Sequence, residues 1–204
     1  MTASASRPAI ALPEPRFDGW LPLGEALRGR RSARDFRPQP LTIGEAATLL
    51  WAAQGVTDPA GLRAAPSAGA LYPLEAYLVA GEVSGLAPGV YRYRPSQHQL
   101  TLLAAGDARA ALTAAAHAQD WIATSAAVLA LAAVFRRASV KYGRRGERYA
   151  VLEAGHAAEN VCLAVAAMGL GATVVGAFDD ARVRALLRLA EDAEPLVLVP
   201  VGRV

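Results

Sequence analysis

Three arginines and a serine lie within a short segment near the start of the chain: Arg30, Arg31, Ser32 and Arg34. A guanidinium group offers forked N–H donors that match the oxygens of a phosphate, and a serine hydroxyl can add one hydrogen bond. This segment therefore predicts a phosphate-binding loop. Taken alone, it fits a solvated loop with surface arginines better, because most arginines in proteins are exposed.

A second stretch consists of residues with small side chains: Pro66, Ser67, Ala68, Gly69 and Ala70. Such residues let the backbone approach a flat ligand closely, and Ser67 adds one hydroxyl group. The pattern is compatible with a ligand-binding loop. On its own, an ordinary tight turn is the simpler interpretation.

A third stretch follows an apolar helical segment and is rich in glycine. Gly169 and Gly171 come after a predicted helix rather than a strand, and no helix opens directly behind them. They therefore do not form a dinucleotide-binding fingerprint. The better prediction is that backbone N–H groups between Val174 and Ala177 point at a ring oxygen or nitrogen of a ligand. Near the chain end, Arg203 either reaches back to a phosphate or is a surface charge.

Lys141 is the only lysine in a chain whose other basic side chains, histidines aside, are all arginines. An arginine stays protonated, whereas a lysine can lose its proton when it is desolvated. Tyr142 follows directly, and an adjacent amine and phenol can move a proton together. The alternative interpretation of this segment is an exposed basic loop.

The composition indicates one folded domain, or a tight dimer of one-domain subunits, because 53% of the 204 residues are hydrophobic and 19% are charged. A net charge of +3 is too small to predict a nucleic-acid partner. Cys162 is the single cysteine, so no disulfide framework or sulfur-bound metal cluster is expected, and it is predicted to be a buried thiol within a helix.

The first twenty residues are rich in proline, alanine and serine and have no signal-peptide pattern. We expect residues 1–20 to form a loose arm and residues 21–204 to form the domain. No apolar run is long enough to span a bilayer, so the expected location is the cytoplasm, with no membrane partner.

Hydrophobic periodicity and capping signals predict helices and strands in alternation, with hairpins as well as crossovers. This mixture favours an α+β fold over a doubly wound sheet. Thr42 and Glu45 form a capping box ahead of one helix, and residues 136–148 read as a polar stretch. The predicted helices cover residues 23–28, 43–54, 107–119, 149–168 and 179–189, and the strands cover 76–80, 90–94, 100–103, 126–134, 172–176 and 196–201.

The sequence lacks the motifs of several other enzyme classes. The chain contains no Gly-x-Ser-x-Gly elbow, no Walker A loop and no His-Glu-x-x-His pair. The three histidines, His98, His117 and His156, are far apart in sequence, and each is expected to be structural or solvated. No metal site is therefore predicted.

The order of the stretches is much more specific than any stretch alone. Along the chain come RRSARDF, APSAGALYP, KYG with GERY, GHAAENVCLAVAAMGLGATVVGAFDD and a closing PVGR. In this order the sequence resembles the nitroreductase-like FMN enzymes, and most closely their branch of SagB-type dehydrogenases. The resemblance extends from about residue 23 to residue 203.

The resemblance implies an α+β nitroreductase-like fold, with a central, mostly antiparallel sheet flanked by helices, in a homodimer that binds FMN at its interface. By analogy, one set of residues holds the phosphate and ribityl chain, the small-residue loop of the partner packs on the isoalloxazine, and a third set presents backbone near its N5 edge. These sets are Arg30, Arg31, Ser32, Arg34 and Arg203; Pro66 to Ala70; and Val175, Gly176 and Ala177.

In azoline-oxidising members of this branch, a Lys-Tyr pair at the position of Lys141 and Tyr142 supports the chemistry. The leading hypothesis is therefore an FMN-dependent dehydrogenase that oxidises an azoline-like ring of a small molecule or a modified peptide. Two alternatives remain open. One is a ping-pong reductase of nitro or quinone compounds that uses NAD(P)H, and the other is a flavin-binding subunit of a peptide-modifying complex that is inactive alone.

Overall fold

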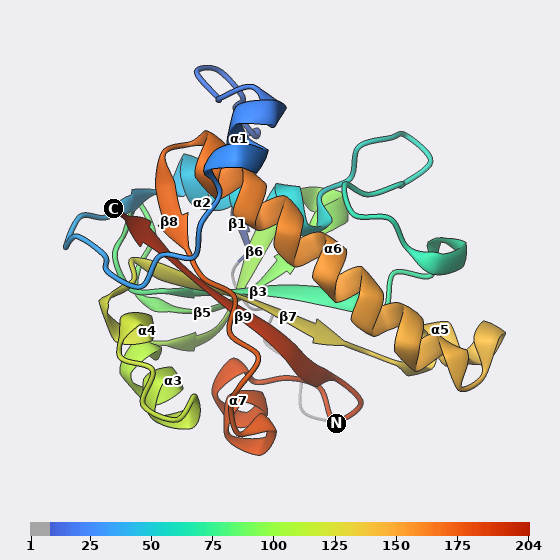
Figure 1. Cartoon of the computed structure of the whole chain (residues 1–204). Coiled ribbons are helices and arrows are strands. Elements are labelled where there is room, and N and C mark those ends of the chain that lie inside the picture. The colour runs from blue at the N-terminus through green and yellow to red at the C-terminus, as the bar shows by residue number, and fades with distance from the viewer. Residues whose placement is uncertain (1–8) are drawn as a thin grey trace.

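A seven-stranded sheet forms the centre of the computed structural model, which describes residues 9–204 (Figure 1). Its strand order is β1-β6-β5-β3-β7-β9-β8, and every neighbouring pair is antiparallel. This confirms the predicted α+β fold. The strands are β1 (Ala9–Ala11), β3 (Leu74–Ala80), β5 (Gly89–Arg94), β6 (Gln99–Ala105), β7 (Ala127–Ala133), β8 (Leu170–Ala172) and β9 (Glu194–Arg203), while β2 (Leu41–Thr42) and β4 (Val83–Ser84) form a small parallel pair.

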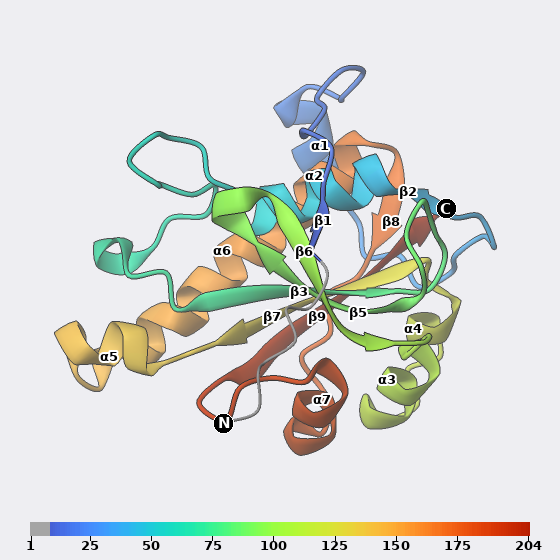
Figure 2. The ribbon, with the colours of Figure 1, turned by 180° about the vertical axis from the view of Figure 1, so that it is seen from behind.

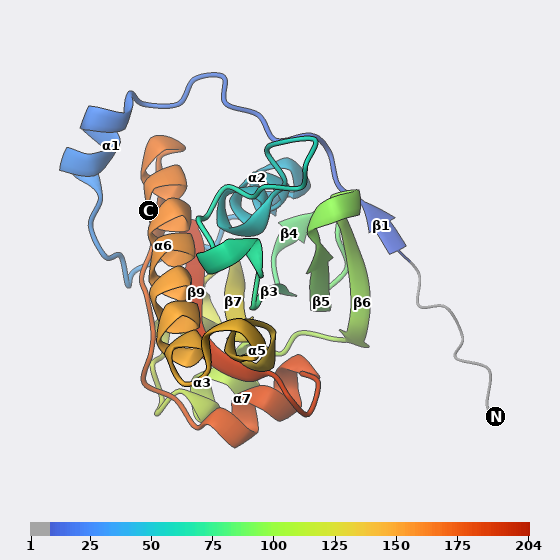
Figure 3. The same ribbon diagram turned by 90° about the vertical axis from the view of Figure 1, so that its right-hand side faces the viewer.

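Helices cover both faces of the sheet, as Figures 1 and 3 show. On one face lie α1, α2, α5 and α6, and on the other lie α3, α4 and α7. The bounds are α1 (Leu23–Gly29), α2 (Ile43–Gln54), α3 (Arg109–Ala115), α4 (Trp121–Thr124), α5 (Arg136–Tyr142), α6 (Arg145–Ala167) and α7 (Asp180–Leu187), with single 3-10 turns at η1 (Ala68–Ala70) and η2 (Pro95–Gln97).

The central strands are buried on both sides, because their alternate side chains enter two separate cores. In β7, Leu129 and Leu131 join the core under α2 and α6, whereas Val128 joins the core under α3 and α7. In β3, likewise, Leu78 joins the core under α2 and α6, and Val79 joins the core under α3 and α7. The helix layers on both faces therefore depend on the register of these strands.

Several predicted elements are confirmed at their ends. The capping box of α2 is present, since the Glu45 N–H donates to Thr42 Oγ1 (3.2 Å) and the Thr42 N–H donates to Glu45 Oε2 (2.7 Å). Asp179 caps α7 by accepting from the Arg182 N–H at 3.0 Å. The buried strand predicted at residues 126–134 is β7.

Other predicted boundaries were wrong. The polar stretch at residues 136–148 contains helix α5 and the first turn of α6, because arginine favours helix and the break is confined to Gly143, at φ 56°. The strand expected at 172–176 ends at Ala172, since beyond it only an isolated bridge joins Val175 to Leu198. The helix expected at 107–119 is shorter than predicted, because α3 covers Arg109–Ala115 and the positive φ angles of His117 and Ala118 end it. The next helix, α4, begins beyond the predicted range, at Trp121.

The described part of the predicted arm lies against the domain. β1 adds an edge strand beside β6, as seen from behind in Figure 2, and His98 Nε2 lies 2.9 Å from the Pro13 carbonyl oxygen. Phe17 packs edge-on against Trp51, with ring centroids 5.2 Å apart. Residues 9–20 are thus attached rather than loose, whereas residues 1–8 of the predicted arm lie outside the described residues.

Arg109 is a buried cation at the turn between β6 and α3. Its guanidinium donates to both carboxylate oxygens of Asp107, at 2.7 and 3.0 Å, and to the Ser125 carbonyl. Gly81 makes room for it, because a Cβ at that position would lie 1.8 Å from Arg109 Nε. The Asp107 carboxylate therefore stabilises a charge that has little access to water.

Removing this carboxylate is expected to destabilise the fold. Asp107→Ala should lower the free energy of unfolding by about 2 kcal/mol, because it leaves the Arg109 charge with only Glu82 and the Ser125 carbonyl. Urea unfolding measures the loss. Asp120→Ala, at an exposed aspartate with no side-chain cap bond, is the matched control, and equal losses in the two variants would contradict the role of Asp107.

Candidate functional site

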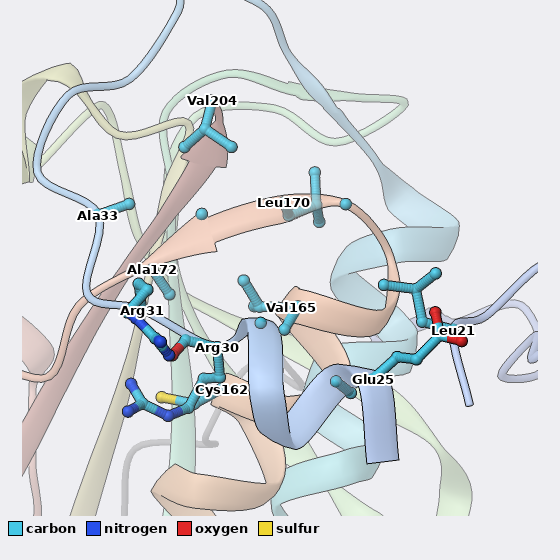
Figure 4. Close-up of a pocket in the computed structure, with 15 residues that line it drawn as sticks. Leu21, Glu25, Arg30, Arg31, Ala33, Cys162, Val165, Leu170, Ala172 and Val204 are labelled. Carbon is cyan, nitrogen blue, oxygen red and sulfur yellow. The ribbon is translucent and has the colours of Figure 1, made fainter. Parts of the chain in front are cut away.

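Two groups of predicted site residues lie near opposite ends of α6. Around its first half, Pro66, Ser67 and Ala68 line a pocket of about 300 Å³ together with Tyr149 and Glu153. Around its second half, Arg30 and Arg31 line a pocket of about 340 Å³. Figure 4 shows this second pocket, with both arginines beside Cys162 and Ala172 and with the chain end at Val204 near its rim.

The structure brings the small-residue loop next to the Lys-Tyr pair. Gly69 has φ 62°, and a Cβ built on it would lie 2.7 Å from Tyr142 Oη and 3.1 Å from Lys141 Nζ. The Tyr142 hydroxyl and the Lys141 amine therefore approach the loop backbone at Gly69, where no side chain blocks them. The sequence treated these two stretches as separate, and folding makes them one site.

Lys141 is exposed in the single chain, and Tyr142 is half-buried. Tyr142 packs edge-on against Tyr149, with ring centroids 5.2 Å apart, and Lys141 Nζ lies 5.4 Å from the Tyr142 ring centroid. The desolvation predicted for Lys141 is thus not provided by its own subunit. Any cover over this amine has to come from a ligand or a second chain.

The loop that meets the pair has a strained backbone. Gly69, Ala70 and Tyr72 all have positive φ, at 62°, 52° and 47°, and the last two are not glycines. The Tyr72 N–H donates to Ser67 Oγ at 2.9 Å, and the Arg137 guanidinium donates to the Tyr72 carbonyl at 3.3 Å. Strain held by such bonds is typical of functional loops.

Glu153 is a buried carboxyl directly beneath this loop, and the sequence analysis missed it. Only 3% of the residue is exposed, and its Oε1 has no hydrogen-bond partner among the described residues. Burial raises the pKa of Glu153 to about 7, although Ser67 and Arg63 act in the opposite direction. A glutamate on the alanine-rich face of α6 was the only sequence signal for it.

The arginines of the predicted phosphate loop have separate partners in the single chain. Arg30 Nε lies 3.5 Å from a Glu159 carboxylate oxygen, and the Arg34 guanidinium lies over the Trp121 ring at 5.4 Å. Arg31 donates to backbone carbonyls of its own segment. The structure therefore places these side chains around one segment but does not make them converge.

Ser32 and Arg203 are both tied to the end of the sheet near this segment. Ser32 forms an isolated parallel bridge with Ala172, the last residue of β8. The Arg203 guanidinium donates to both carboxylate oxygens of Glu45, at 2.8 Å each, and to the Pro40 carbonyl. The capping glutamate of α2 thus also fixes the orientation of Arg203, a second role that the sequence did not indicate.

The backbone between Val174 and Ala177 only partly matches the prediction. The Val175 N–H is already used, because it donates to the Leu198 carbonyl at 2.8 Å. The N–H groups of Gly176 and Ala177 are exposed and have no acceptor within residues 9–204. Of the three residues, Gly176 and Ala177 are therefore the possible donors to a ligand.

Cys162 lines the second pocket, but its thiol is not expected to be reactive. It is 6% exposed, and burial raises the pKa of its thiol to about 11, so almost no thiolate is present at neutral pH. No group of three metal-ligating acidic, histidine or cysteine side chains is found in the described part of the chain. From residue 9 onward, no helix has the length and apolar character needed to cross a membrane.

The buried Glu153 should make stability depend on pH. An acid with a higher pKa in the folded state binds a proton on folding, so stability falls as pH rises from about 4.5 to about 7 and then stays level. The loss attributed to Glu153 is about 3 kcal/mol. Glu153→Gln should remove this slope and be more stable than the parent at pH 8, as urea unfolding at several pH values would measure.

Glu147→Gln is the matched control, because Glu147 is an exposed glutamate in the first turn of the same helix. Its unfolding should keep the slope of the parent protein. An equal slope in the parent and in Glu153→Gln would show that the Glu153 carboxyl is ionised in the fold.

Comparisons with known proteins identify the family of this chain. Residues 27–203 match the nitroreductase family. A protein of Methanocaldococcus jannaschii with a nitroreductase name is 43% identical over 181 residues, which are 89% of this chain and 90% of that protein. The crystal structure of a Ralstonia eutropha protein, also named a nitroreductase, is 33% identical, with a TM-score of 0.84 over 99% of this chain and 92% of that one.

A more distant likeness is to a chain of the Escherichia coli microcin synthetase McbBCD complex with truncated pro-MccB17 bound. It is 26% identical, with a TM-score of 0.73 over 88% of this chain and 72% of that chain. The family match covers most of the sequence, and the first two relatives align along nearly their whole length. The chain therefore belongs to the nitroreductase family of oxidoreductases.

Proposed function

We propose that this protein is an FMN-dependent dehydrogenase that acts as a homodimer and oxidises an azoline-like ring to the azole. The observation that carries the proposal is the contact of Gly69 with Lys141 and Tyr142, which places an amine and a phenol against a loop of small residues. The likeness to a chain of a microcin synthetase complex supports a modified peptide, or a small molecule of similar chemistry, as the substrate.

The predicted donor residues, of which Arg30 and Arg31 line the second pocket, fit a cofactor that carries a phosphate. The ion pair of Arg30 with Glu159 is partly exposed, so exchanging the carboxylate for a phosphate costs little. The free N–H groups of Gly176 and Ala177 suit the polar edge of a flavin ring. FMN, when bound, supplies a ring that accepts a hydride. The residues proposed to hold its phosphate and ribityl chain are Arg30, Arg31, Ser32, Arg34 and Arg203.

A second copy of the chain is needed to join the two groups. The 23 residues of α6 span about 34 Å, and the loop of residues 66–70 lies near one end of this helix while the arginines lie near the other. A two-fold axis across α6 brings the loop of one subunit to the arginines of its partner. The exposed side of α6 suits such a contact, since Val151 and Leu152 are about half exposed and a Cβ at Gly155 would meet nothing.

The Lys-Tyr pair is proposed to handle the proton of the reaction. Covering the exposed Lys141 by a partner or substrate would remove water from its amine and favour the neutral form that accepts a proton. Tyr142 Oη lies against the same point of the loop and can hydrogen-bond the reacting group. The loop backbone, held by Ser67 and Tyr72, keeps the substrate at this position.

An absorption spectrum of the purified protein is the first test. The two flavin bands in the near-ultraviolet and blue are expected, because the donor set above matches FMN. Anaerobic NADPH should leave these bands unchanged if the protein is the azoline dehydrogenase. Rapid bleaching would instead favour the NAD(P)H-dependent reductase, which the nitroreductase names of the relatives support. A colourless protein that cannot be reconstituted with FMN would contradict the cofactor assignment.

Replacing the amine tests the role of Lys141. Lys141→Ala should lower turnover of an azoline peptide at least about 100-fold, because general base catalysis contributes at least that much. Bound FMN should remain, as the flavin absorbance would show. Arg144→Ala is the matched control, since Arg144 is an exposed cation three residues further on. Unchanged turnover in Lys141→Ala would contradict the role, and turnover found only with a copurified partner would favour the subunit hypothesis.

A further inference from the structure

A second cationic pocket lies apart from the proposed redox site. It is lined by residues at the start of β3 and has a volume of about 380 Å³. The start of β3 is on the left in Figure 2. None of the residues proposed to hold flavin or move a proton lines it. Its charged lining residues are Arg63, Glu75, Arg92, Arg94 and Arg137.

Glu75 is the one carboxylate among these charged groups. Its Oε1 accepts from Arg92 and from Arg137, each at 2.5 Å, and its Oε2 accepts from the Tyr77 hydroxyl at 2.7 Å. Burial acts to raise the pKa of Glu75, but the Tyr77 hydrogen bond and the two guanidinium groups lower it below its usual value. The charged lining residues are therefore one ionised carboxylate and four guanidinium groups, so the pocket has a net positive charge.

Arg63 is a half-buried cation whose direct partners are neutral, while the Glu153 carboxyl acts on it at longer range. Its guanidinium donates to the neutral Gln54 Oε1 at 2.8 Å and lies over the Tyr72 ring at 4.2 Å. No carboxylate forms an ion pair with it within residues 9–204. Burial lowers the pKa of Arg63, yet an arginine keeps its charge at any ordinary pH. An anion in the pocket would stabilise this half-buried charge.

The pocket also contains many free donors. A guanidinium has five N–H groups, whereas among the described residues Arg92 and Arg94 make one side-chain hydrogen bond each and Arg137 makes two. Since Glu75 holds Arg92 and Arg137 in place, their remaining N–H groups are oriented before any ligand arrives. Forked donors in fixed positions match the oxygens of phosphate and carboxylate groups.

We propose that this pocket is a binding site for a small oxyanion ligand, with two or more negative charges on phosphate or carboxylate groups, held by Arg63, Arg92 and Arg137. The site adds to the proposed function and does not depend on it. Arg63 and Arg137 both contact Tyr72, whose N–H bonds to Ser67 in the loop beside Lys141. A bound oxyanion would therefore also steady the loop of the redox site.

Isothermal titration of the purified protein with inorganic pyrophosphate, and separately with citrate, tests the site. We expect saturable binding of at least one, weakened about tenfold in Arg63→Gln, because one charge-assisted contact is lost. Arg137→Gln, at a more exposed position, provides a second variant with the same expected loss. Binding of pyrophosphate alone would identify a phosphate ligand, and binding of citrate alone a carboxylate ligand.

Two control variants make the result specific. Arg136→Gln changes an exposed neighbour outside the pocket and should bind like the parent protein. Arg31→Gln changes the proposed flavin phosphate site and should also leave this binding unchanged. Loss of binding in Arg31→Gln but not in Arg63→Gln would assign the anion to the flavin site and overturn the proposal. Absence of saturable binding to the parent protein would overturn it as well.

Discussion

The close packing of α6 on the sheet is the constraint on which both halves of the site depend. Ala150, Ala154, Ala157 and Ala158 lie on the buried side of this helix and are at most 4% exposed. Their small side chains let the helix axis lie near the strands, whereas longer side chains would lift it away. Because the pocket with Glu153 and the pocket with Arg30 are both lined by α6, such a shift would move them together.

Near one end of the same helix lie several features that lower the stability of the fold. A buried carboxyl at Glu153, a loop with three positive φ angles and an exposed lysine meet where α5, α6 and the loop of residues 66–72 converge. Buried charge and strained backbone each lower stability, and folded proteins retain them mainly where function requires them. The segment with Arg30, Arg31 and Arg34 has no residue with positive φ. The end of α6 near Lys141 is therefore the part of the site that is most organised within one chain.

Local signals in the sequence were sufficient for elements that depend on neighbouring residues. The box of Thr42 and Glu45 and the cap at Asp179 were predictable because each bond spans three positions. The helix at residues 136–142 was not, because its polar composition resembles a loop and only its packing against α6 reveals it. There a Cβ at Gly146 would lie 2.5 Å from the Ser139 nitrogen, so only glycine permits the contact.

The candidate site shows the same division between local and long-range information. The order of the sequence blocks led to a prediction of which stretches form the site, but not to the prediction that Gly69 meets Lys141 and Tyr142 across more than seventy residues. Nor did it indicate that Glu45 orients Arg203, or that Glu153 lies beneath the loop. These are tertiary contacts between residues whose individual patterns are ordinary, so no periodicity or spacing marks them.

The two cationic sites differ in how far they are organised before a ligand binds. Arg92 and Arg137 are fixed by one buried carboxylate, whereas Arg30, Arg31 and Arg34 have unrelated partners and must turn before they can surround a phosphate. If the partner's loop completes the flavin site, part of the free energy of flavin binding is the free energy of association. Thermodynamic linkage then requires the reverse effect, so bound flavin strengthens the dimer and dilution to monomers weakens the hold on the flavin.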